Sequence, residues 1–221
     1  MQLTHLAEKV HSSVLAVLEK EGVETLRPVQ EKAIDAGLLE GKNLLVCTPT
    51  ASGKTLVAEL AALMHIMSQK GKAVYIVPLR ALASEKFKSF NQRYGHIAKV
   101  AISSGDIDSD ESYLASYDLI VCTAEKFDSL LRHHAPWIRQ VSCLIVDEVH
   151  LLNDAGRGPT LEVVMTLMRH LLPSVQTIAL SATIGNPRQL AAWMEAELVQ
   201  DTWRPVQLKH GVYHGGSIQF D

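Results

Sequence analysis

Two short segments of the chain carry residues whose types and spacing could perform phosphate chemistry. The first is TPTASGKT, residues 48–55, which follows an apolar run and precedes a helix-like stretch. In a strand–loop–helix unit, backbone N–H groups and the positive helix N-terminus can hold phosphate oxygens. Lys54 is expected to reach the β- and γ-phosphates, and the Thr55 hydroxyl is expected to ligate Mg²⁺. The usual GxxxxGK[ST] pattern has glycine where this chain has Thr48, whereas Gly53 is kept. The alternative is an ordinary turn that happens to contain Gly-Lys-Thr.

The second segment is CLIVDEVH, residues 143–150, which ends an apolar run with Asp147 and Glu148. In P-loop enzymes, an acid at the end of a neighbouring buried strand holds Mg²⁺, often through water. The next carboxylate can then polarise the attacking water. A solvated Asp-Glu pair at a strand end is the alternative, which the phosphate loop in the same chain disfavours. Lys54, Asp147 and Glu148 are therefore the predicted catalytic residues, and Thr55 and Asp147 the predicted metal ligands.

These segments need a scaffold, and the apolar pattern predicts one. Short β-branched runs that are apolar on both faces are typical of central strands covered on each side. Such runs occupy residues 43–47, 73–77, 98–102, 118–122, 143–147 and 177–180. Stretches with helical apolar spacing lie between or after them, at residues 55–69, 79–92, 125–133, 160–171 and 187–196. This alternation predicts an α/β fold with a mostly parallel sheet and helices on both faces. An amphipathic helix over residues 3–20 is expected outside that repeat.

The composition limits the class of protein. The chain has 221 residues, a formal charge of −3, 47% hydrophobic residues and 20% charged residues. These values suit one large globular domain or two small ones, and they exclude both a disordered chain and a histone-like basic protein. A nucleic-acid contact would need a local basic patch, because the net charge does not favour it.

Neither a membrane anchor nor a targeting segment is expected. The longest apolar stretch, residues 56–67, is interrupted by Glu59 and His65 and is shorter than the roughly 18 residues that a spanning helix needs. The three cysteines form no CxxC pair, and each lies in or beside an apolar run, which predicts buried, inert thiols in a reducing compartment. The expected location is the cytoplasm, or the nucleoid within it.

Several motifs together resemble superfamily-two helicases of the DExH branch. TPTASGKT, DEVH and SAT (residues 181–183) are similar to motifs I, II and III of that superfamily. LRPVQ (26–30) resembles its Q-motif, PLRAL (78–82) motif Ia, and TAEK (123–126) motif Ib, with SGD at 104–106 between the last two. In combination they are closest to the archaeal Hjm repair helicases and the helicase domain of polymerase theta.

The resemblance implies a RecA-like P-loop NTPase fold and a division of the chain. Residues 1–25 would form an N-terminal helical segment, and residues 26–202 the first RecA-like, ATP-binding domain. Residues 203–221 would form a hairpin or linker toward a second RecA-like domain. The second domain of such motors supplies arginine fingers, each typically worth about 10³–10⁵ in turnover. The chain by itself is therefore expected to bind Mg-ATP weakly and to hydrolyse it poorly.

The resemblance also implies roles for single residues. Gln30 would contact the adenine edge, and the loop residues would surround the phosphates: Pro49, Thr50, Ala51, Ser52, Gly53, Lys54 and Thr55. A second group would couple the ATP site to the strand-binding face: His150, Ser181, Ala182 and Thr183. The expected nucleic-acid contacts follow the ends of successive strands: Pro78, Arg80, Ser104, Gly105, Thr123 and Lys126. Because these ends share one edge of a parallel sheet, the contacts would be to phosphates and independent of base sequence.

The leading hypothesis is the first motor domain of an ATP-dependent DNA helicase that uses ATP and Mg²⁺. By resemblance it would translocate 3′ to 5′ on single-stranded or branched DNA in repair or fork processing, as a monomer. An RNA helicase of the same superfamily is the nearest alternative, since backbone contacts alone do not separate the two polymers. A P-loop kinase or small-molecule ATPase would leave the SAT and TAEK motifs unexplained. A non-catalytic nucleotide-binding platform predicts damage at Lys54, Asp147 or Glu148, and all three are present.

Overall fold

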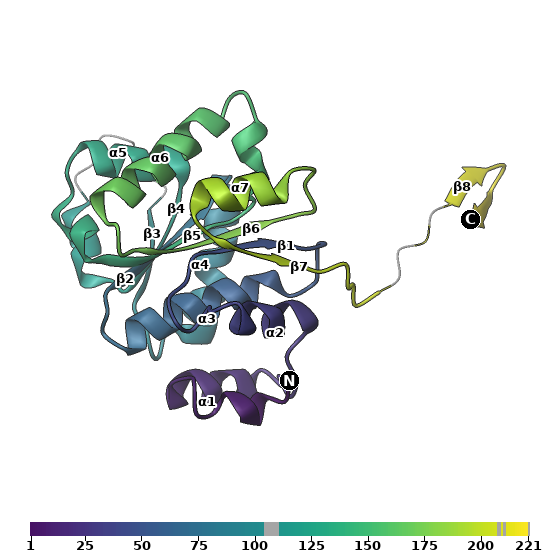
Figure 1. Cartoon of the computed structure of the whole chain (residues 1–221), viewed down its shortest axis with the longest axis horizontal. Helices are drawn as coiled ribbons and strands as arrows, with labels where there is room; N and C mark the ends of the chain where they lie inside the picture. The colour runs from purple at the N-terminus through teal and green to yellow at the C-terminus, as the bar shows by residue number, and fades with distance from the viewer. Residues whose placement is uncertain (104–110, 207–208, 210, 221) are drawn as a thin grey trace.

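The core of the fold is a seven-stranded parallel sheet with the strand order β3-β4-β2-β5-β6-β1-β7 (Figure 1). A computed structural model describes residues 1–103, 111–206, 209 and 211–220. The strands of the sheet are β1 Leu44–Cys47, β2 Lys72–Val77, β3 Val100–Ser103, β4 Leu119–Thr123, β5 Val141–Val146, β6 Gln176–Ser181 and β7 Glu197–Gln200. The predicted α/β class is confirmed, and all six expected strands are present.

Helices cover both faces of the sheet, as predicted. On one face lie α1 Ser12–Lys20, α2 Pro28–Asp35, α3 Lys54–Met67 and α4 Arg80–Tyr94. On the other lie α5 Ala124–Arg132, α6 Gly158–Leu171 and α7 Pro187–Met194 (Figure 1). Successive residues of β1 point to opposite faces, so Leu44 and Val46 enter the first apolar cluster while Leu45 and Cys47 enter the second. This explains why the central strands are apolar throughout.

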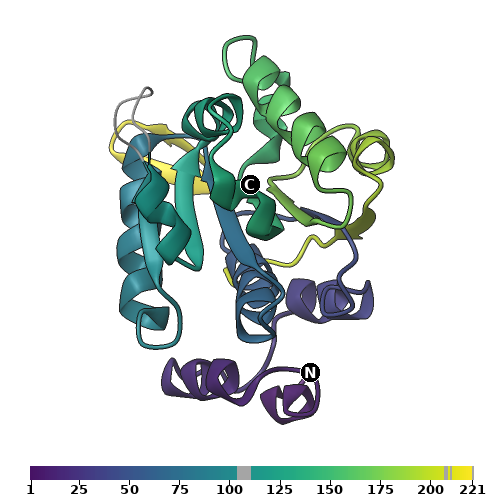
Figure 2. The ribbon, with the colours of Figure 1, turned by 90° about the vertical axis from the view of Figure 1, so that its left-hand side faces the viewer.

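Several elements differ from the sequence prediction, among them helix α2, which lies in none of the predicted helical stretches. The expected helix over residues 3–20 is two elements, a 3₁₀ turn η1 (Leu3–Leu6) and α1, because the His11 side chain accepts a hydrogen bond from the Ser13 N–H and starts a new helix there. These elements form a layer beneath the rest of the fold (Figure 2). Their side chains belong to the same apolar cluster as α3. Strand β7 was not predicted, because an edge strand with only one fully buried residue has no apolar run.

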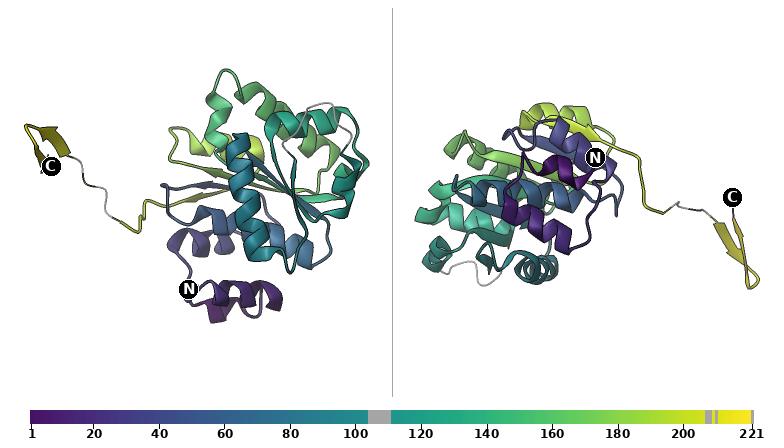
Figure 3. Two further views of the ribbon diagram at one scale, coloured as in Figure 1. Left: turned by 180° about the vertical axis from the view of Figure 1, so that it is seen from behind. Right: turned by 90° about the horizontal axis from the view of Figure 1, so that it is seen from below.

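The remaining elements are short. Three further 3₁₀ turns are η2 Ser112–Ser116, η3 Pro136–Gln140 and η4 Val149–Asn153. Beyond the sheet, β8 Gly211–His214 and β9 Ser217–Phe220 form an antiparallel hairpin that stands away from the body of the fold (Figure 3). Its turn residues Gly215 and Gly216 have φ values of 55° and 83°, the left-handed region that two-residue hairpin turns require.

The burial of the cysteines agrees with the expectation from the sequence. All three cysteines are buried free thiols, and burial raises the pKa of Cys47 to about 11. Within the part of the chain that the structure describes, every helix is too short or too polar to cross a membrane.

The parallel arrangement determines where the chemistry-bearing segments meet. The phosphate loop follows β1, residue 78 follows β2, Asp147 follows β5, and Ser181 ends β6. In a parallel sheet these carboxyl ends share one edge, which is where ligands bind in α/β folds. The candidate active site is therefore expected at this edge of the sheet.

Candidate active site

The phosphate loop is a tight connection between β1 and α3. It turns through two residues with positive φ, Ala51 at 65° and Gly53 at 97°. The hydroxyls of Thr48 and Ser52 lie 2.7 Å apart and join the two ends of the loop. Gly53 precedes the first residue of the 14-residue helix α3, so the backbone N–H groups at this helix N-terminus point into the loop. The loop therefore has the geometry of an anion-binding cradle.

Helix α2 anchors this loop from the side. The Gln30 side-chain amide donates to the Gly53 carbonyl at 3.0 Å, and its oxygen accepts from the Arg27 backbone N–H at 2.8 Å. The Arg27 guanidinium donates to the Ala51 carbonyl at 2.7 Å. Arg27 was not predicted as a site residue, although it lies inside the LRPVQ motif. The structure gives both residues a role in holding the loop.

The acidic strand end lies against the loop. Asp147 and Glu148 directly follow β5, and Glu148 has a φ of 53°, which turns its side chain back toward α3. Its carboxylate lies 3.8 Å from the Lys54 ammonium. The Glu148 backbone N–H donates to Asp147 at 3.0 Å, and the Tyr75 hydroxyl donates to the other Asp147 oxygen at 2.9 Å. The three residues predicted as catalytic are thus in one place.

Tyr75 was missed by the sequence analysis, because a tyrosine in a central strand is ordinarily a core residue. Its ring is buried, and only its hydroxyl reaches Asp147. Burial and the negative charge of Asp147 raise the pKa of Tyr75 well above its ordinary value. Tyr75 therefore stays protonated and acts as a hydrogen-bond donor that orients Asp147.

The donor atoms at this point suit a magnesium ion. The Lys86 ammonium lies 3.4 Å from the Thr55 hydroxyl and 3.6 Å from an Asp147 oxygen, so these two oxygens face one cationic group. Hydroxyl and carboxylate oxygens are ligands that Mg²⁺ prefers, usually together with waters and substrate phosphates. No group of three or more His, Cys, Asp or Glu side chains that could hold a metal occurs among the described residues. The predicted pair, Thr55 and Asp147, is therefore consistent with a metal shared with phosphates and not with an all-protein cage.

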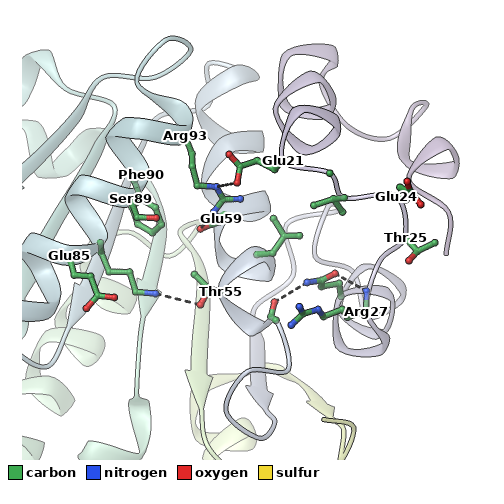
Figure 4. A pocket seen from close by; sticks show the side chains of 16 residues that line it. Glu21, Glu24, Thr25, Arg27, Thr55, Glu59, Glu85, Ser89, Phe90 and Arg93 are labelled. Carbon is green, nitrogen blue, oxygen red and sulfur yellow. Dashed lines mark hydrogen bonds and ion pairs between the residues drawn. The ribbon is translucent and has the colours of Figure 1, made fainter. Parts of the chain in front are cut away.

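A cavity of about 630 Å³ extends from the loop along α3 (Figure 4). Pockets for small organic ligands generally measure roughly 300–1,000 Å³. The N-terminal segment forms one side with Glu21, Glu24 and Thr25, and α4 forms the opposite side with Glu85 and Ser89. The loop residue Gly53 also lines the cavity. A nucleoside next to the phosphate loop would find room here.

A partly buried ion pair between Arg93 and Glu59 also lines this cavity. Arg93 donates to both oxygens of Glu59 at 2.7 and 2.9 Å, and the Tyr94 hydroxyl donates to Glu59 at 2.7 Å. Arg93 also pairs with Glu21 at 3.2 Å, which ties the N-terminal segment to α4. This cluster maintains the spacing between the two sides of the cavity.

Two of the expected coupling residues, Ser181 and His150, contact the phosphate loop and Glu148 respectively. The Thr48 backbone N–H donates to the Ser181 carbonyl at 3.2 Å, so the end of β6 contacts the start of the phosphate loop. The Ser181 side chain is fully buried, whereas Ala182 is half-buried and Thr183 is exposed. His150 lies 3.3 Å from Glu148 through its Nδ1 atom.

The expected nucleic-acid residues differ in their exposure to solvent. Arg80 is exposed at the start of α4 and Pro78 is half-buried beside it. The buried Thr123 hydroxyl accepts a hydrogen bond from the Lys126 N–H and caps α5. Lys126 differs from the expectation, because only 3% of it is exposed and its ammonium pairs with Glu111 at 3.3 Å instead of facing solvent. Ser104 and Gly105 lie outside the described residues.

Comparison with known proteins agrees with this geometry. The sequence model of the DEAD/DEAH box helicases matches residues 27–190. The chain belongs to the DEAD/DEAH box helicase family. It is 51% identical over 211 residues to the ATP-dependent DNA helicase Hel308 of Pyrococcus abyssi, covering 95% of this chain and 29% of that protein. It is 49% identical over 214 residues to Hel308 of Methanocaldococcus jannaschii, covering 94% of this chain and 18% of that protein. The chain therefore spans less than a third of the length of these relatives.

Solved structures confirm the RecA-like helicase fold. The crystal structure of the DUF1998 helicase MrfA bound to DNA has a TM-score of 0.75 and 25% identity, over 88% of this chain and 30% of MrfA. The structure of MrfA bound to DNA and AMPPNP gives the same values. Both the helicase family and the fold class expected from the sequence motifs are thus confirmed.

Proposed function

We propose that this chain is the ATP-binding first motor domain of an ATP-dependent DNA helicase. The observation that carries the proposal is the convergence of Lys54, Thr55, Asp147 and Glu148 at the phosphate loop, whose residues Gly53 and Thr55 line a nucleotide-sized cavity. The identity of about half of the residues with Hel308 helicases supports the choice of DNA.

The residues would act on ATP as follows. Lys54 exchanges its contact with Glu148 for the β- and γ-phosphate oxygens, which are stronger anionic partners. Glu148 is then released to accept a proton from the attacking water. Thr55 and Asp147 would hold Mg²⁺, which supplies neutralisation of the phosphate charge when bound. Tyr75 keeps Asp147 oriented through its hydrogen bond.

The other end of the nucleotide would lie beside α2. Gln30 already uses its oxygen for Arg27 and one N–H for Gly53. Its amide has a second N–H, which can donate to a base. An adenine held there would be linked to the phosphate loop through the hydrogen bond from Gln30 to the Gly53 carbonyl.

The DNA strand would cross the carboxyl edge of the sheet near Pro78, Arg80 and Thr123. Phosphate contacts of this kind are independent of sequence and weaken with salt. We propose 3′-to-5′ translocation on single-stranded or branched DNA, with a second RecA-like domain that completes the ATP site. The motor would act as a monomer on the nucleoid, in the cytoplasm.

A steady-state ATPase assay of the 221-residue chain tests the proposal of half a motor. We expect weak Mg-ATP binding and little turnover with or without single-stranded DNA, because an arginine finger typically contributes about 10³–10⁵ in rate. Robust DNA-stimulated turnover by this chain alone would contradict it. In the intact helicase, stronger stimulation by RNA than by DNA would instead favour the RNA helicase alternative.

A further inference from the structure

Lys86 of α4 is a cation at the metal-binding end of the site, and the sequence motifs assign it no role. Its side chain is 20% exposed, and its ammonium contacts both the Thr55 hydroxyl at 3.4 Å and the Asp147 carboxylate at 3.6 Å. It also lies 5.5 Å from the centre of the Tyr75 ring, whose hydroxyl donates to the same carboxylate. The dashed line to Thr55 in Figure 4 marks the first of these contacts.

The charges around Lys86 indicate what it does when a nucleotide binds. Asp147 and Glu148 place two carboxylates beside the phosphate loop, and each has one ammonium partner, Lys86 and Lys54 respectively. When phosphates bind Lys54, Lys86 is the cation that still compensates Asp147. A carboxylate without such a partner would repel the γ-phosphate in a partly buried site.

A metal ion and an ammonium group cannot both occupy the space between the same two oxygens. Because Lys86 is on a flexible four-carbon stem, it can withdraw toward the exposed side of α4 when a divalent ion arrives. Its positive charge would then oppose the arriving ion, while in the absence of a metal the same charge would favour the phosphates. The Lys86 charge would thus disfavour nucleotide binding with Mg²⁺ and favour it without metal. Because these effects on affinity have opposite signs, they can be measured separately.

We propose that the Lys86 ammonium and Mg²⁺ exchange at Thr55 and Asp147. Lys86 is then a positioning residue that supports nucleotide binding without metal and competes with the metal when it is present. This inference rests on the proposed nucleotide-binding function and adds a residue to it.

The test is the dependence of nucleotide affinity on the metal. Fluorescent methylanthraniloyl-ATP is titrated into the 221-residue chain, once in EDTA and once in saturating Mg²⁺. The quantity compared between variants is the Kd in EDTA divided by the Kd in Mg²⁺. In Lys86→Met we expect this ratio to rise about tenfold over the unaltered chain, the fold-change that corresponds to one lost charge-assisted contact. The rise should come from weaker binding in EDTA, with binding in Mg²⁺ unchanged or tighter.

Three variants keep this test specific. Lys86→Arg retains the positive charge and should keep the original ratio, and Lys86→Gln should behave as Lys86→Met does. Lys88→Met removes an exposed lysine from the same helix and should change nothing. Thermal unfolding of each variant checks that the fold is intact, and a failure of Lys86→Met to fold leaves the glutamine and arginine variants to decide.

The outcomes separate the two proposals. An unchanged ratio in both neutral variants, with Lys54→Ala still weakening binding, would overturn the role of Lys86 and leave the nucleotide site intact. A ratio in Lys86→Arg equal to that of Lys86→Met would also overturn it, because charge would not be the cause. If the unaltered chain bound no nucleotide in either buffer, both proposals would fall.

Discussion

The side-chain amide of Gln30 donates a hydrogen bond to the backbone carbonyl of Gly53 across 3.0 Å and so joins α2 to the phosphate loop. Gly53 is the N-cap of α3 and has a φ of 97°, a conformation that residues with a Cβ rarely adopt. A Cβ built at this position would lie 2.6 Å from the Gln30 nitrogen. The loop conformation and its anchor therefore depend on the same glycine.

Gly53→Ala should weaken nucleotide binding at least tenfold, because the alanine displaces both the Gln30 amide and the loop backbone. Gly41→Ala is the matched control, since Gly41 also has a positive φ of 85° but nothing within 4 Å of its Cβ position. Both variants should lose on the order of 1–2 kcal/mol of stability from the strained backbone. Thermal unfolding and methylanthraniloyl-ATP titration measure the two effects. Equal nucleotide affinities in the two variants would show that the Gln30 contact does not hold the loop.

Lys54→Ala should reduce nucleotide affinity by roughly ten- to a hundredfold. The substitution removes one charge-assisted phosphate contact, of order 1.5–3 kcal/mol. Lys42→Ala is the control, because Lys42 is an exposed lysine that pairs with Glu197 away from the loop. Fluorescent-nucleotide titration of both variants makes the comparison. Unchanged affinity in Lys54→Ala would refute the assignment of the phosphate loop.

Glu148→Gln should retain ATP binding and abolish turnover in the intact helicase. Glutamine has nearly the shape of glutamate but cannot accept the proton of the attacking water, and general-base catalysis typically contributes about 10²–10⁴ in rate. Steady-state ATPase in the presence of single-stranded DNA measures the loss, with Glu162→Gln on the exposed side of α6 as the control. If the Glu148→Gln enzyme turned over normally, another group would have to be the base.

His65 predicts a pH dependence of stability at the opposite edge of the sheet. Its ring is buried between the Ser142 hydroxyl at 2.9 Å and the Gln176 side-chain oxygen at 2.8 Å. Gln176 donates its own amide to the carbonyls of Leu38 and Lys42, so its oxygen is the acceptor and His65 Nε2 is the donor. Neutral histidine with its proton on Nε2 satisfies both contacts.

Burial lowers the pKa of His65 below its ordinary value of 6.5, with Lys70 adding to the effect and the Gln176 hydrogen bond opposing it. As the pH falls, the unfolded chain therefore binds a proton at this histidine at a higher pH than the folded chain does. The stabilisation is fully present above pH 6.5 and is lost as the pH falls toward the lowered pKa. Urea unfolding between pH 8 and pH 5 should show a steeper loss of stability for the unaltered chain than for His65→Gln. Parallel curves for the two proteins would contradict this.

The sequence by itself determined the fold class and located most of the proposed catalytic group. Strand–helix alternation of apolar runs is a property of consecutive residues, so it predicted the parallel sheet and located all six of its apolar strands. The catalytic group also lies in short contiguous motifs, and a parallel sheet necessarily brings the ends of its strands to one edge. The positions of Lys54, Thr55, Asp147 and Glu148 therefore needed no tertiary information.

Only the tertiary structure decided the contacts of residues whose partners are distant along the chain. Tyr75 and Lys86 look like an ordinary strand tyrosine and an ordinary helix lysine, and only the packing of β2, β5 and α4 brings both to Asp147. Lys126 looks like an exposed basic residue of a motif, yet the fold buries it against Glu111. The physical reason is the same in each case: periodicity and motif spacing specify the local backbone, whereas the burial and charge partners of a long side chain depend on which elements pack against it.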